Sequence, residues 1–278
     1  MINIAIITIF REDIYNTRHI QKNIFLEKIQ ILKKYGNFDI FLIEQSNDNQ
    51  KFNIGKLKNI GFELANNNNN YDFFILTDID ILPDENLAPY YFKPIKGITL
   101  FGTRGSRYKG ECLSGSAIGI DKESFLKING YPNSFWGWGG EDDNFLMRCN
   151  YHKIKIFIPK KGNIIDIEYD NLGKNISSDK KLMMLKDGNL KEDNRYEKLL
   201  LSVSIWNTDG LNNLNYKILD QDINKIRYYK VDLQYDIDQK LFPNWFKLYK
   251  FQKISEEKIK YLYYKLKKKY KKCIYISY

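Results

Sequence analysis

The chain has 278 residues, of which 43% are hydrophobic, so it is long enough for one large domain with an appendage and apolar enough to bury a sizeable core. Its net charge of +10 comes from residues 240–278, which hold twelve lysines and two acids, while the rest of the chain balances 32 basic against 32 acidic side chains. This distribution argues against a general affinity of the main part of the chain for nucleic acid.

The cysteines and the apolar runs point to the compartment. Cys112, Cys149 and Cys273 are odd in number and lack CxxC spacing, so neither a disulfide framework nor a structural zinc site is indicated. The apolar start of the chain lacks the features of a signal peptide, and no apolar segment approaches the ~20 residues that span a bilayer. We therefore expect a cytoplasmic protein, soluble or peripheral on the inner face of the cytoplasmic membrane.

Strands and helices are expected to alternate in the first part of the chain. Apolar runs predict strands at residues 2–10, 39–44 and 72–77, and helical spacing predicts a helix at residues 17–35. A second helix is expected at 53–65, followed by a polar loop of asparagines at 66–70. A strand, a helix and a strand in that order make a right-handed crossover, which builds a parallel sheet. The predicted fold class is therefore α/β, with a mostly parallel central sheet flanked by helices.

Shorter elements are expected after residue 97. They are strands at 98–101, 114–120 and 228–233, edge strands at 155–159 and 163–168, helices at 121–129, 141–150 and 196–205, and a long polar loop at 171–194. Beyond Phe242, a stripe of Ile259, Leu262, Leu266 and Tyr270 among lysines predicts an amphipathic basic helix. The chain thus divides into a domain at 1–239 and a basic, aromatic helical tail at 240–278.

The segment TDIDILP, residues 77–83, places two carboxylates where the third strand ends. In open α/β sheets, ligands gather at the carboxyl ends of the strands. Asp78 and Asp80 suit a hard divalent cation together with the diphosphate that the cation neutralises. Solvated turns often contain the same D-x-D pattern, so a metal-binding role for this pair needs support from other motifs in the chain.

The stretch FWGWGGEDDN, residues 135–144, combines two indoles, three glycines and three consecutive acids. Such acids repel one another and lose hydration beside Trp136 and Trp138, so a purely structural role would be costly. Indole faces stack on sugar rings, and carboxylates accept hydrogen bonds from sugar hydroxyls. The alternative is a glycine-rich turn that starts a helix at Glu141, with the acids at its positive end. We favour a sugar site.

Four segments resemble the β-1,4-galactosyltransferase family, glycosyltransferase family seven, and they follow the family's order. They are FNIGKLKNIGF (52–62), LTDIDILP (76–83), FLKINGYPNSFWGWGGEDDNFLMRC (125–149) and TDGLNNLNYKILD (208–220). The resemblance implies the GT-A nucleotide-sugar-binding fold. It also implies an inverting, metal-dependent transfer of galactose or N-acetylgalactosamine from a UDP-sugar to a sugar hydroxyl, with Mn²⁺ or Mg²⁺ as cofactor.

The resemblance assigns the donor side of the site. Phe10, Arg11 and Phe52 would contact uridine and its phosphates. Asp78 would touch the nucleotide, and Asp80 would ligate the metal.

The resemblance also assigns the acceptor side. Trp138 and Gly139 would lie near the donor diphosphate and the acceptor sugar, Glu141 would hold sugar hydroxyls, and Asp142 would be the catalytic base. The residues implied in acceptor binding are Trp138, Gly140, Asp143 and Tyr196. Independently, an inverting transfer needs one carboxylate to deprotonate the acceptor hydroxyl while a metal stabilises the departing diphosphate.

Two departures from the family pattern affect the charges of the site. The vertebrate relatives carry an Arg where Ile54 stands, so a phosphate contact is expected instead from Arg104 or Arg107 in a basic loop. The relatives complete the metal site with a Met and a His, and here Glu168 and Asp170 fall at or near those positions. We expect them to complete an all-oxygen site for manganese or magnesium.

The setting and the partners follow from composition. A residue bias typical of an AT-rich genome and the missing membrane anchor suggest a bacterial enzyme of surface polysaccharide or lipooligosaccharide synthesis. The tail is expected either to dock on an anionic membrane, where a lipid-linked acceptor is found, or to pack on the domain. The alternatives for function are a polypeptide-directed or retaining transferase of the same fold and a non-catalytic glycan-binding module.

Overall fold

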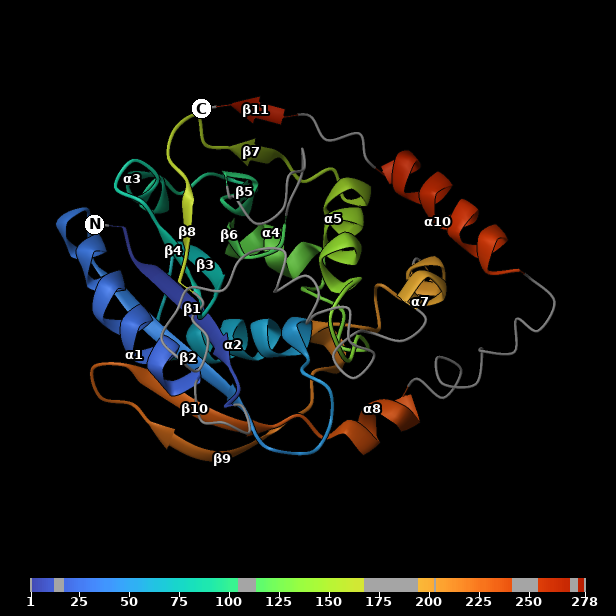
Figure 1. Ribbon diagram of the computed structural model, residues 1–278, viewed down its shortest axis with the longest axis horizontal. Coiled ribbons are helices and arrows are strands. Elements are labelled where there is room, and N and C mark those ends of the chain that lie inside the picture. The colour runs from blue at the N-terminus through green and yellow to red at the C-terminus, as the bar shows by residue number, and fades with distance from the viewer. Residues whose placement is uncertain are drawn as a thin grey trace.

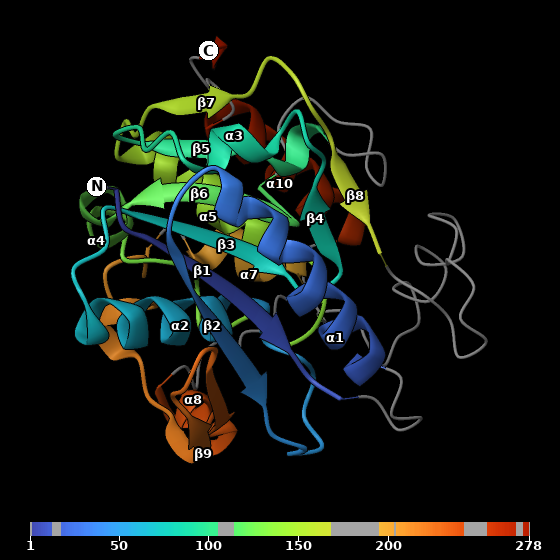
Figure 2. The same ribbon diagram turned by 90° about the vertical axis from the view of Figure 1, so that its left-hand side faces the viewer.

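The computed structural model describes residues 2–12, 18–104, 114–167, 195–202, 204–241, 255–270 and 275–277. Within these ranges the centre is a nine-stranded sheet with the order β11-β7-β5-β6-β3-β1-β2-β10-β9 (Figure 2). Its strands are β1 (Ile4–Phe10), β2 (Phe38–Gln45), β3 (Phe73–Asp78), β5 (Ile98–Leu100), β6 (Ala117–Asp121), β7 (Ile156–Ile158), β9 (Lys217–Asp222), β10 (Arg227–Asp232) and β11 (Tyr275–Ser277). A small second sheet pairs β4 (Ile81–Pro83) with β8 (Ile164–Asp166).

The expected parallel core is confirmed. β1 lies between β2 and β3 and runs parallel to both, and β10 runs parallel to β2. β6 is antiparallel to its neighbours β3 and β5, so the sheet is mixed with parallel pairs at its centre. Every residue of β1 is buried, as expected of a strand that helices cover on both faces.

Helices cover both faces of the sheet (Figures 1 and 2). One face packs against α1 (Arg18–Lys28), its 3₁₀ continuation (Ile29–Lys34) and α3 (Ala88–Tyr91). The other packs against α2 (Ile54–Asn68), α4 (Lys122–Lys127) and α5 (Glu141–Tyr151). Outside α5 lie α7 (Arg195–Ser202) and α10 (Glu256–Tyr270), and α8 (Tyr235–Leu241) follows β10 (Figure 1).

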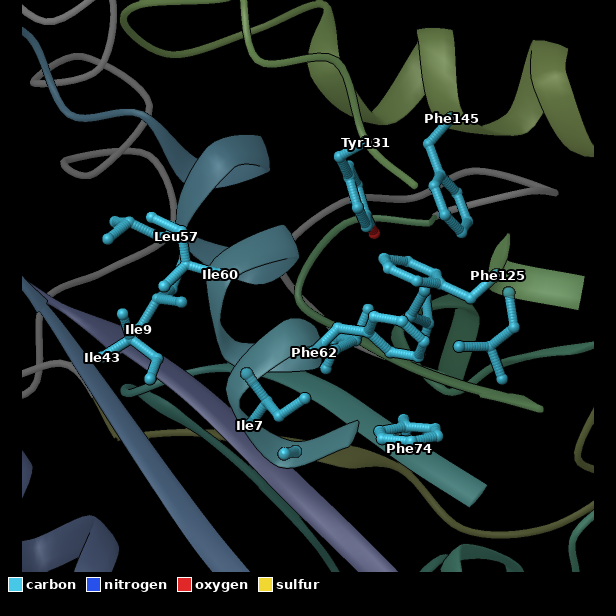
Figure 3. Packing of buried hydrophobic residues seen from close by; sticks show 14 of the residues in the cluster. Ile7, Ile9, Ile43, Leu57, Ile60, Phe62, Phe74, Phe125, Tyr131 and Phe145 are labelled. Carbon is cyan, nitrogen blue, oxygen red and sulfur yellow. The ribbon is translucent and has the colours of Figure 1, made fainter. Parts of the chain in front are cut away.

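The larger hydrophobic core joins α2 to the strands and to α5 (Figure 3). On α2, Phe62 lies 4.4 Å from the ring of Phe125 on α4. Tyr131 stacks on Phe145 of α5 with the ring centroids 4.1 Å apart. Because aromatic rings are large and rigid, this chain of contacts fixes the position of α5 relative to the carboxyl ends of the strands.

Three expected elements differ from the structure. α2 continues to Asn68 instead of ending before the asparagines, because the N–H of Asn69 still bonds to the carbonyl of Ala65. β7 was expected at an edge but lies between β11 and β5. The strand expected at 228–233 is confirmed as β10, but it is not the last strand as expected, since β11 follows it. β9 was missed because all six of its residues are exposed, so no apolar pattern marks it.

The described part of the tail packs on the domain. On α10, Ile259 and Tyr263 are 7% and 4% exposed, and the helix contacts α5 and α7. β11 adds to the main sheet beside β7. Packing was one of the two alternatives for the tail, and the boundary at residue 239 stays a prediction. None of the described helices combines the length and the apolar character needed to cross a membrane.

Candidate active site

The two carboxylates of TDIDILP lie at the carboxyl end of β3. Asp78 is the last residue of the strand, its N–H donates to the carbonyl of Ser116 (2.9 Å), and its side chain is 30% exposed. Asp80 lies in the turn to β4 and is only 4% exposed, and its carbonyl accepts a hydrogen bond from the N–H of Ile167 (2.8 Å). The pair thus stands at the sheet edge where ligands gather in open α/β folds.

The glycine-rich stretch forms the turn from which α5 begins. Gly139 and Gly140 have φ angles of +105° and +109°, which side chains rarely adopt, and a Cβ on Gly140 would lie 2.6 Å from the ring of Phe135. The N–H of Gly139 donates to Oε2 of Glu141 (3.1 Å). Burial raises the pKa of the Glu141 carboxyl well above its usual value, and the charge of Asp142 adds to the rise.

Asp142 carries a poorly solvated carboxylate at the same helix end. Its Oδ1 is shielded from water and accepts no hydrogen bond from the residues that the structure describes. Its Oδ2 would meet a Cβ on Gly115 at 2.7 Å, so a glycine leaves the room that it occupies. Burial raises the pKa of Asp142 to about 6, against the lowering effect of Lys58, and the charges of Asp78 and Asp143 add to the rise. A carboxylate with such a pKa is suited to accept a proton near neutral pH.

A buried lysine connects the two acidic groups. Lys58 of α2 is 1% exposed, and its Nζ lies 3.4 Å from Oδ1 of Asp78 and 5.4 Å from the centre of the Tyr131 ring. Burial by itself would lower the pKa of Lys58, but the charges of Asp78, Asp142 and Glu141 raise it. The structure therefore places this ammonium group in an ion pair with Asp78, and the charges of Asp142 and Glu141 also act on it.

On the expected donor side, the structure brings Arg11 and Phe52 together. The guanidinium carbon of Arg11 lies 5.5 Å from the centre of the Phe52 ring, and its Nη1 lies 3.8 Å from Oδ1 of Asp48. The carbonyl of Phe52 accepts a hydrogen bond from the N–H of Gly137, which links this side to the glycine-rich turn. Phe10 is 3% exposed and packs in the core on the α1 face. Its contact with uridine stays a prediction.

The expected acceptor side lies between α5, α7 and α10. The guanidinium carbon of Arg195 lies 5.9 Å from the half-buried Trp138 ring and 4.8 Å from the Tyr196 ring. The hydroxyl of Tyr263 donates to Oδ2 of Asp143 (2.8 Å), and its ring lies 4.9 Å from that of Tyr196. Trp138, Asp143 and Tyr196 were expected here from the sequence, and α10 joins them.

Several other expectations concern residues around this centre. Trp136 is 4% exposed and meets Tyr235 edge-on, so it belongs to the core and not to an open sugar face. Nε of Arg104 donates to the carbonyl of Gly162 (2.9 Å). The remaining predicted residues, Arg107, Glu168 and Asp170, lie outside the described residues.

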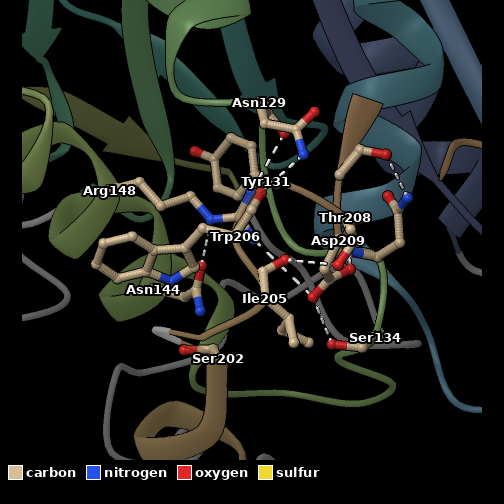
Figure 4. Close-up of polar contacts among 12 residues, drawn as sticks. Asn129, Tyr131, Ser134, Asn144, Arg148, Ser202, Ile205, Trp206, Thr208 and Asp209 are labelled. Atoms are coloured by element: carbon tan, nitrogen blue, oxygen red, sulfur yellow. Dashed lines mark hydrogen bonds and ion pairs between the residues drawn. The ribbon is translucent and has the colours of Figure 1, made fainter. Parts of the chain in front are cut away.

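A buried polar network supports α5 and the turn before it (Figure 4). Arg148 and Asp209 are both fully buried, with Nη2 3.9 Å from Oδ2, and Nε of Arg148 donates to Oδ1 of Asn144 (2.7 Å). The hydroxyl of Ser134 donates to Oδ2 of Asp209 (2.8 Å). Burial lowers the pKa of Arg148 to about 10 and raises that of Asp209. The TDG segment, residues 208–210, thus supports α5 through the contact of Asp209 with Arg148.

The oxygen donors at the end of β3 fit a hard divalent cation. Asp80 offers a carboxylate in the turn, and the shielded Oδ1 of Asp78 has only the ion pair with Lys58 beside it among the described residues. Within those residues no cluster of three or more His, Cys, Asp or Glu side chains could hold a metal by itself. A cation held by Asp80 would take further ligands from the phosphate oxygens of a nucleotide and from the predicted Glu168 and Asp170, which lie outside the described residues.

Sequence reasoning missed three residues of this centre. Lys58 stands in FNIGKLKNIGF among buried positions, and a lysine in such a helix is its only local signal. Arg195 was passed over beside Tyr196. Tyr263 lies one position after the predicted stripe residue Leu262 and is the more buried of the two.

Comparisons with known proteins show the family of this chain. Residues 1–93 match the family model described as the N-terminal region of glycosyl transferase group 7, and residues 101–171 match one described as the N-terminal domain of galactosyltransferase. The chain belongs to glycosyltransferase group 7. This group 7 chain is 31% identical over 216 residues to β-1,4-galactosyltransferase 4 of Mus musculus, covering 77% of its own length and 57% of the relative's. It is 30% identical over 188 residues to β-1,4-galactosyltransferase 1 of Homo sapiens, covering 66% and 44%.

The fold of this group 7 chain also agrees with a solved structure. A mutant of Drosophila β-1,4-galactosyltransferase 7, in complex with manganese, UDP-Gal and xylobiose, superposes with a TM-score of 0.65 at 22% identity, covering 86% of this chain and 97% of the other. The GT-A fold expected from the sequence is confirmed. The chain spans about half the length of the curated relatives it matches, at 57% for the mouse protein and 44% for the human one.

Proposed function

We propose that this chain is an inverting, metal-dependent glycosyltransferase that moves galactose or N-acetylgalactosamine from a UDP-sugar to a sugar hydroxyl and forms a β linkage. The observation that carries the proposal is the shielded carboxylate of Asp142, with a pKa near 6, beside the ion pair of Lys58 and Asp78. The names of the related galactosyltransferases support it. So does the complex of the similar Drosophila enzyme with UDP-Gal and xylobiose.

Each residue of the site has a part in this reaction. Oδ1 or Oδ2 of Asp142 accepts the proton of the acceptor hydroxyl as the oxygen attacks the anomeric carbon and the bond to UDP breaks. Glu141 and Asp143 accept hydrogen bonds from sugar hydroxyls, and the Trp138 ring offers an apolar face for stacking. Arg11 and Phe52 hold the nucleotide. A bound Mn²⁺ or Mg²⁺, held by Asp80, would neutralise the charge of the leaving diphosphate.

The test is a screen of UDP-sugars with Mn²⁺, Mg²⁺ or chelator, with several sugar acceptors. We expect metal-dependent turnover of UDP-galactose or UDP-N-acetylgalactosamine, and a β-linked product by NMR. An α-linked product would indicate a retaining transferase, and transfer to a peptide would indicate a polypeptide-directed one. Glycan binding with no turnover of any UDP-sugar would indicate a non-catalytic binding module. Each of these results would overturn the proposal.

We further propose that the acceptor is lipid-linked and belongs to a bacterial surface polysaccharide or lipooligosaccharide, which the protein reaches from the cytoplasmic face of the membrane. The support is the excess of positive charge in residues 240–278 and the exposed lysines of α10, among them Lys258, Lys265 and Lys268. The test is sedimentation with vesicles that contain anionic lipid. Reversal of these three lysines to Glu leaves the buried face of α10 intact and is expected to release the protein. Equal sedimentation of both forms, or none of either, would contradict membrane docking.

A further inference from the structure

Two lysines of α2 are buried two residues apart, and their surroundings differ. Lys56 is fully buried and well satisfied, since its Nζ lies 2.8 Å from both carboxylate oxygens of Asp238 and 2.6 Å from the carbonyl of Leu233. These contacts join α2 to α8, away from the site acids. Lys58 has a looser contact, 3.4 Å from one oxygen of Asp78. These contacts account for the burial of Lys56, whereas the single ion pair with Asp78 does not account for the burial of Lys58.

Burying an ammonium group has a large cost unless nearby negative charges offset it. Around Lys58 these charges are Asp78 from β3 and Glu141 and Asp142 from α5, and together they raise its pKa despite its burial. The Asp78 side chain remains 30% exposed, although its Oδ1 beside Lys58 is shielded from water. The arrangement places a buried cation against one carboxylate of the proposed donor group, where the charges of the two acids at the start of α5 also act on it.

Without that cation, the three carboxylates would repel one another. The ion pair of Lys58 with Asp78 links α2 to β3, and the charges of Glu141 and Asp142 at the start of α5 also act on this ammonium group. Loss of the link would let the carboxylates move apart. A displacement of about 1 Å in a catalytic group is enough to slow a reaction by roughly 10²-fold.

We propose that Lys58 is a positioning residue, an internal counter-cation that holds Asp78 through their ion pair and offsets the charge of Asp142 during sugar transfer. The proposal rests on the function proposed above. Lys58 does not touch the sugar and takes no proton from it. Its ammonium offsets the negative charge of the acids, and by the same repulsion it weakens the binding of a divalent cation close by.

Because Lys58 acts on both the acids and the metal, its removal is expected to change kcat and Mn²⁺ affinity in opposite directions. Lys58→Met removes the charge and keeps an unbranched side chain of similar length. We expect kcat for transfer to fall by about 10- to 100-fold. We also expect Mn²⁺, measured in the presence of UDP by the EPR signal of the unbound ion, to bind roughly three- to tenfold more tightly, because a like charge near the metal has been removed. A site that is merely misfolded would lose both properties together.

Two variants serve as controls. Lys58→Arg keeps the charge and is expected to regain most of the lost kcat. Lys56→Met removes the matched buried lysine on the same helix, so it is expected to lower the melting temperature while leaving kcat of the folded protein and Mn²⁺ affinity close to wild type.

Two results would overturn the proposal. One is Lys58→Met with kcat within twofold of wild type, and the other is weaker Mn²⁺ binding together with lower kcat. If the wild-type protein transfers no sugar at all, the proposed function fails by itself. The Mn²⁺ titration of Lys58→Met against wild type still reports on the counter-cation.

Discussion

Asp142 is the residue on which the proposed chemistry most depends. Asp142→Asn keeps the shape of the side chain and removes its capacity to accept a proton, so we expect the transfer rate to fall by ~10²–10⁴-fold. UDP affinity, measured by calorimetry with Mn²⁺, should change by no more than a few-fold, because the nucleotide is held by other residues. A mutant that turns over like wild type would remove Asp142 from the role of base.

The pKa of the same carboxyl predicts a pH dependence. Burial raises it to about 6, with Asp78 and Asp143 adding to the rise and Lys58 opposing it. The base must be ionised, and it is ionised above its pKa, so kcat/KM should increase as pH rises through about 6 and level off above it. A rate that falls over this range would contradict the assignment. The measurement needs a fixed, saturating concentration of metal.

Asp80 is the described carboxylate that we expect to hold the metal. Asp80→Ala should abolish the increase in UDP affinity that Mn²⁺ produces, because the diphosphate charge then lacks its partner. Calorimetry of UDP binding with and without Mn²⁺ measures this increase. Equal UDP affinities for mutant and wild type in the presence of metal would show that Asp80 does not hold it.

Among the elements, α10 has a role that its composition does not indicate. Its lysines suggested a membrane surface, yet Ile259 and Tyr263 face the domain, and Tyr263 bonds to Asp143. α10 therefore forms part of the wall beside the expected acceptor side. Packing on the domain does not conflict with membrane docking, because the buried and the basic faces of α10 are different.

Tyr263→Phe removes only the hydroxyl that orients Asp143. A hydrogen bond to a charged group is worth about 1.5–3 kcal/mol, so we expect the KM for the acceptor to rise roughly tenfold or more. Hydrolysis of the UDP-sugar without acceptor should stay unchanged, since it needs only the donor side. Tyr261→Phe and Tyr264→Phe are matched controls, because both residues are 59% exposed on the same helix. An unchanged acceptor KM in Tyr263→Phe would separate α10 from the acceptor.

At the scale of the whole molecule, Arg148 and Asp209 join segments that are distant in the chain. Asp209→Ala would leave the buried Arg148 guanidinium without its partner, and breaking a buried pair in this way typically costs about 3–5 kcal/mol of the free energy of unfolding. Urea or thermal unfolding measures the loss. Asp220→Ala, on the exposed strand β9, is the control and should change stability little. A similar stability for both variants would argue against a supporting role of the network.

The order of the central elements could be read from the sequence because it rests on local patterns. β1, β2 and β3 are nearly continuous apolar runs. α2 begins after Asn53, whose side chain accepts a hydrogen bond from the N–H of Lys56, and α5 begins directly after the glycines. The sequence patterns did not predict exposed or short elements such as β9, whose side chains face water and show no apolar period. Apolar periodicity arises because one face of an element is buried, so an element that is not buried shows no such period.

The sequence by itself determined where the site acids fall, since Asp78 and Asp80 follow a buried strand and Glu141 and Asp142 begin a helix after glycines. Only the tertiary structure decided what surrounds them. Tyr263 and Asp143 are 120 residues apart, and Lys58 of α2 makes an ion pair with Asp78 of β3. Contacts of this kind depend on how whole elements pack, and a single ion pair or hydrogen bond across that distance leaves no period in the chain.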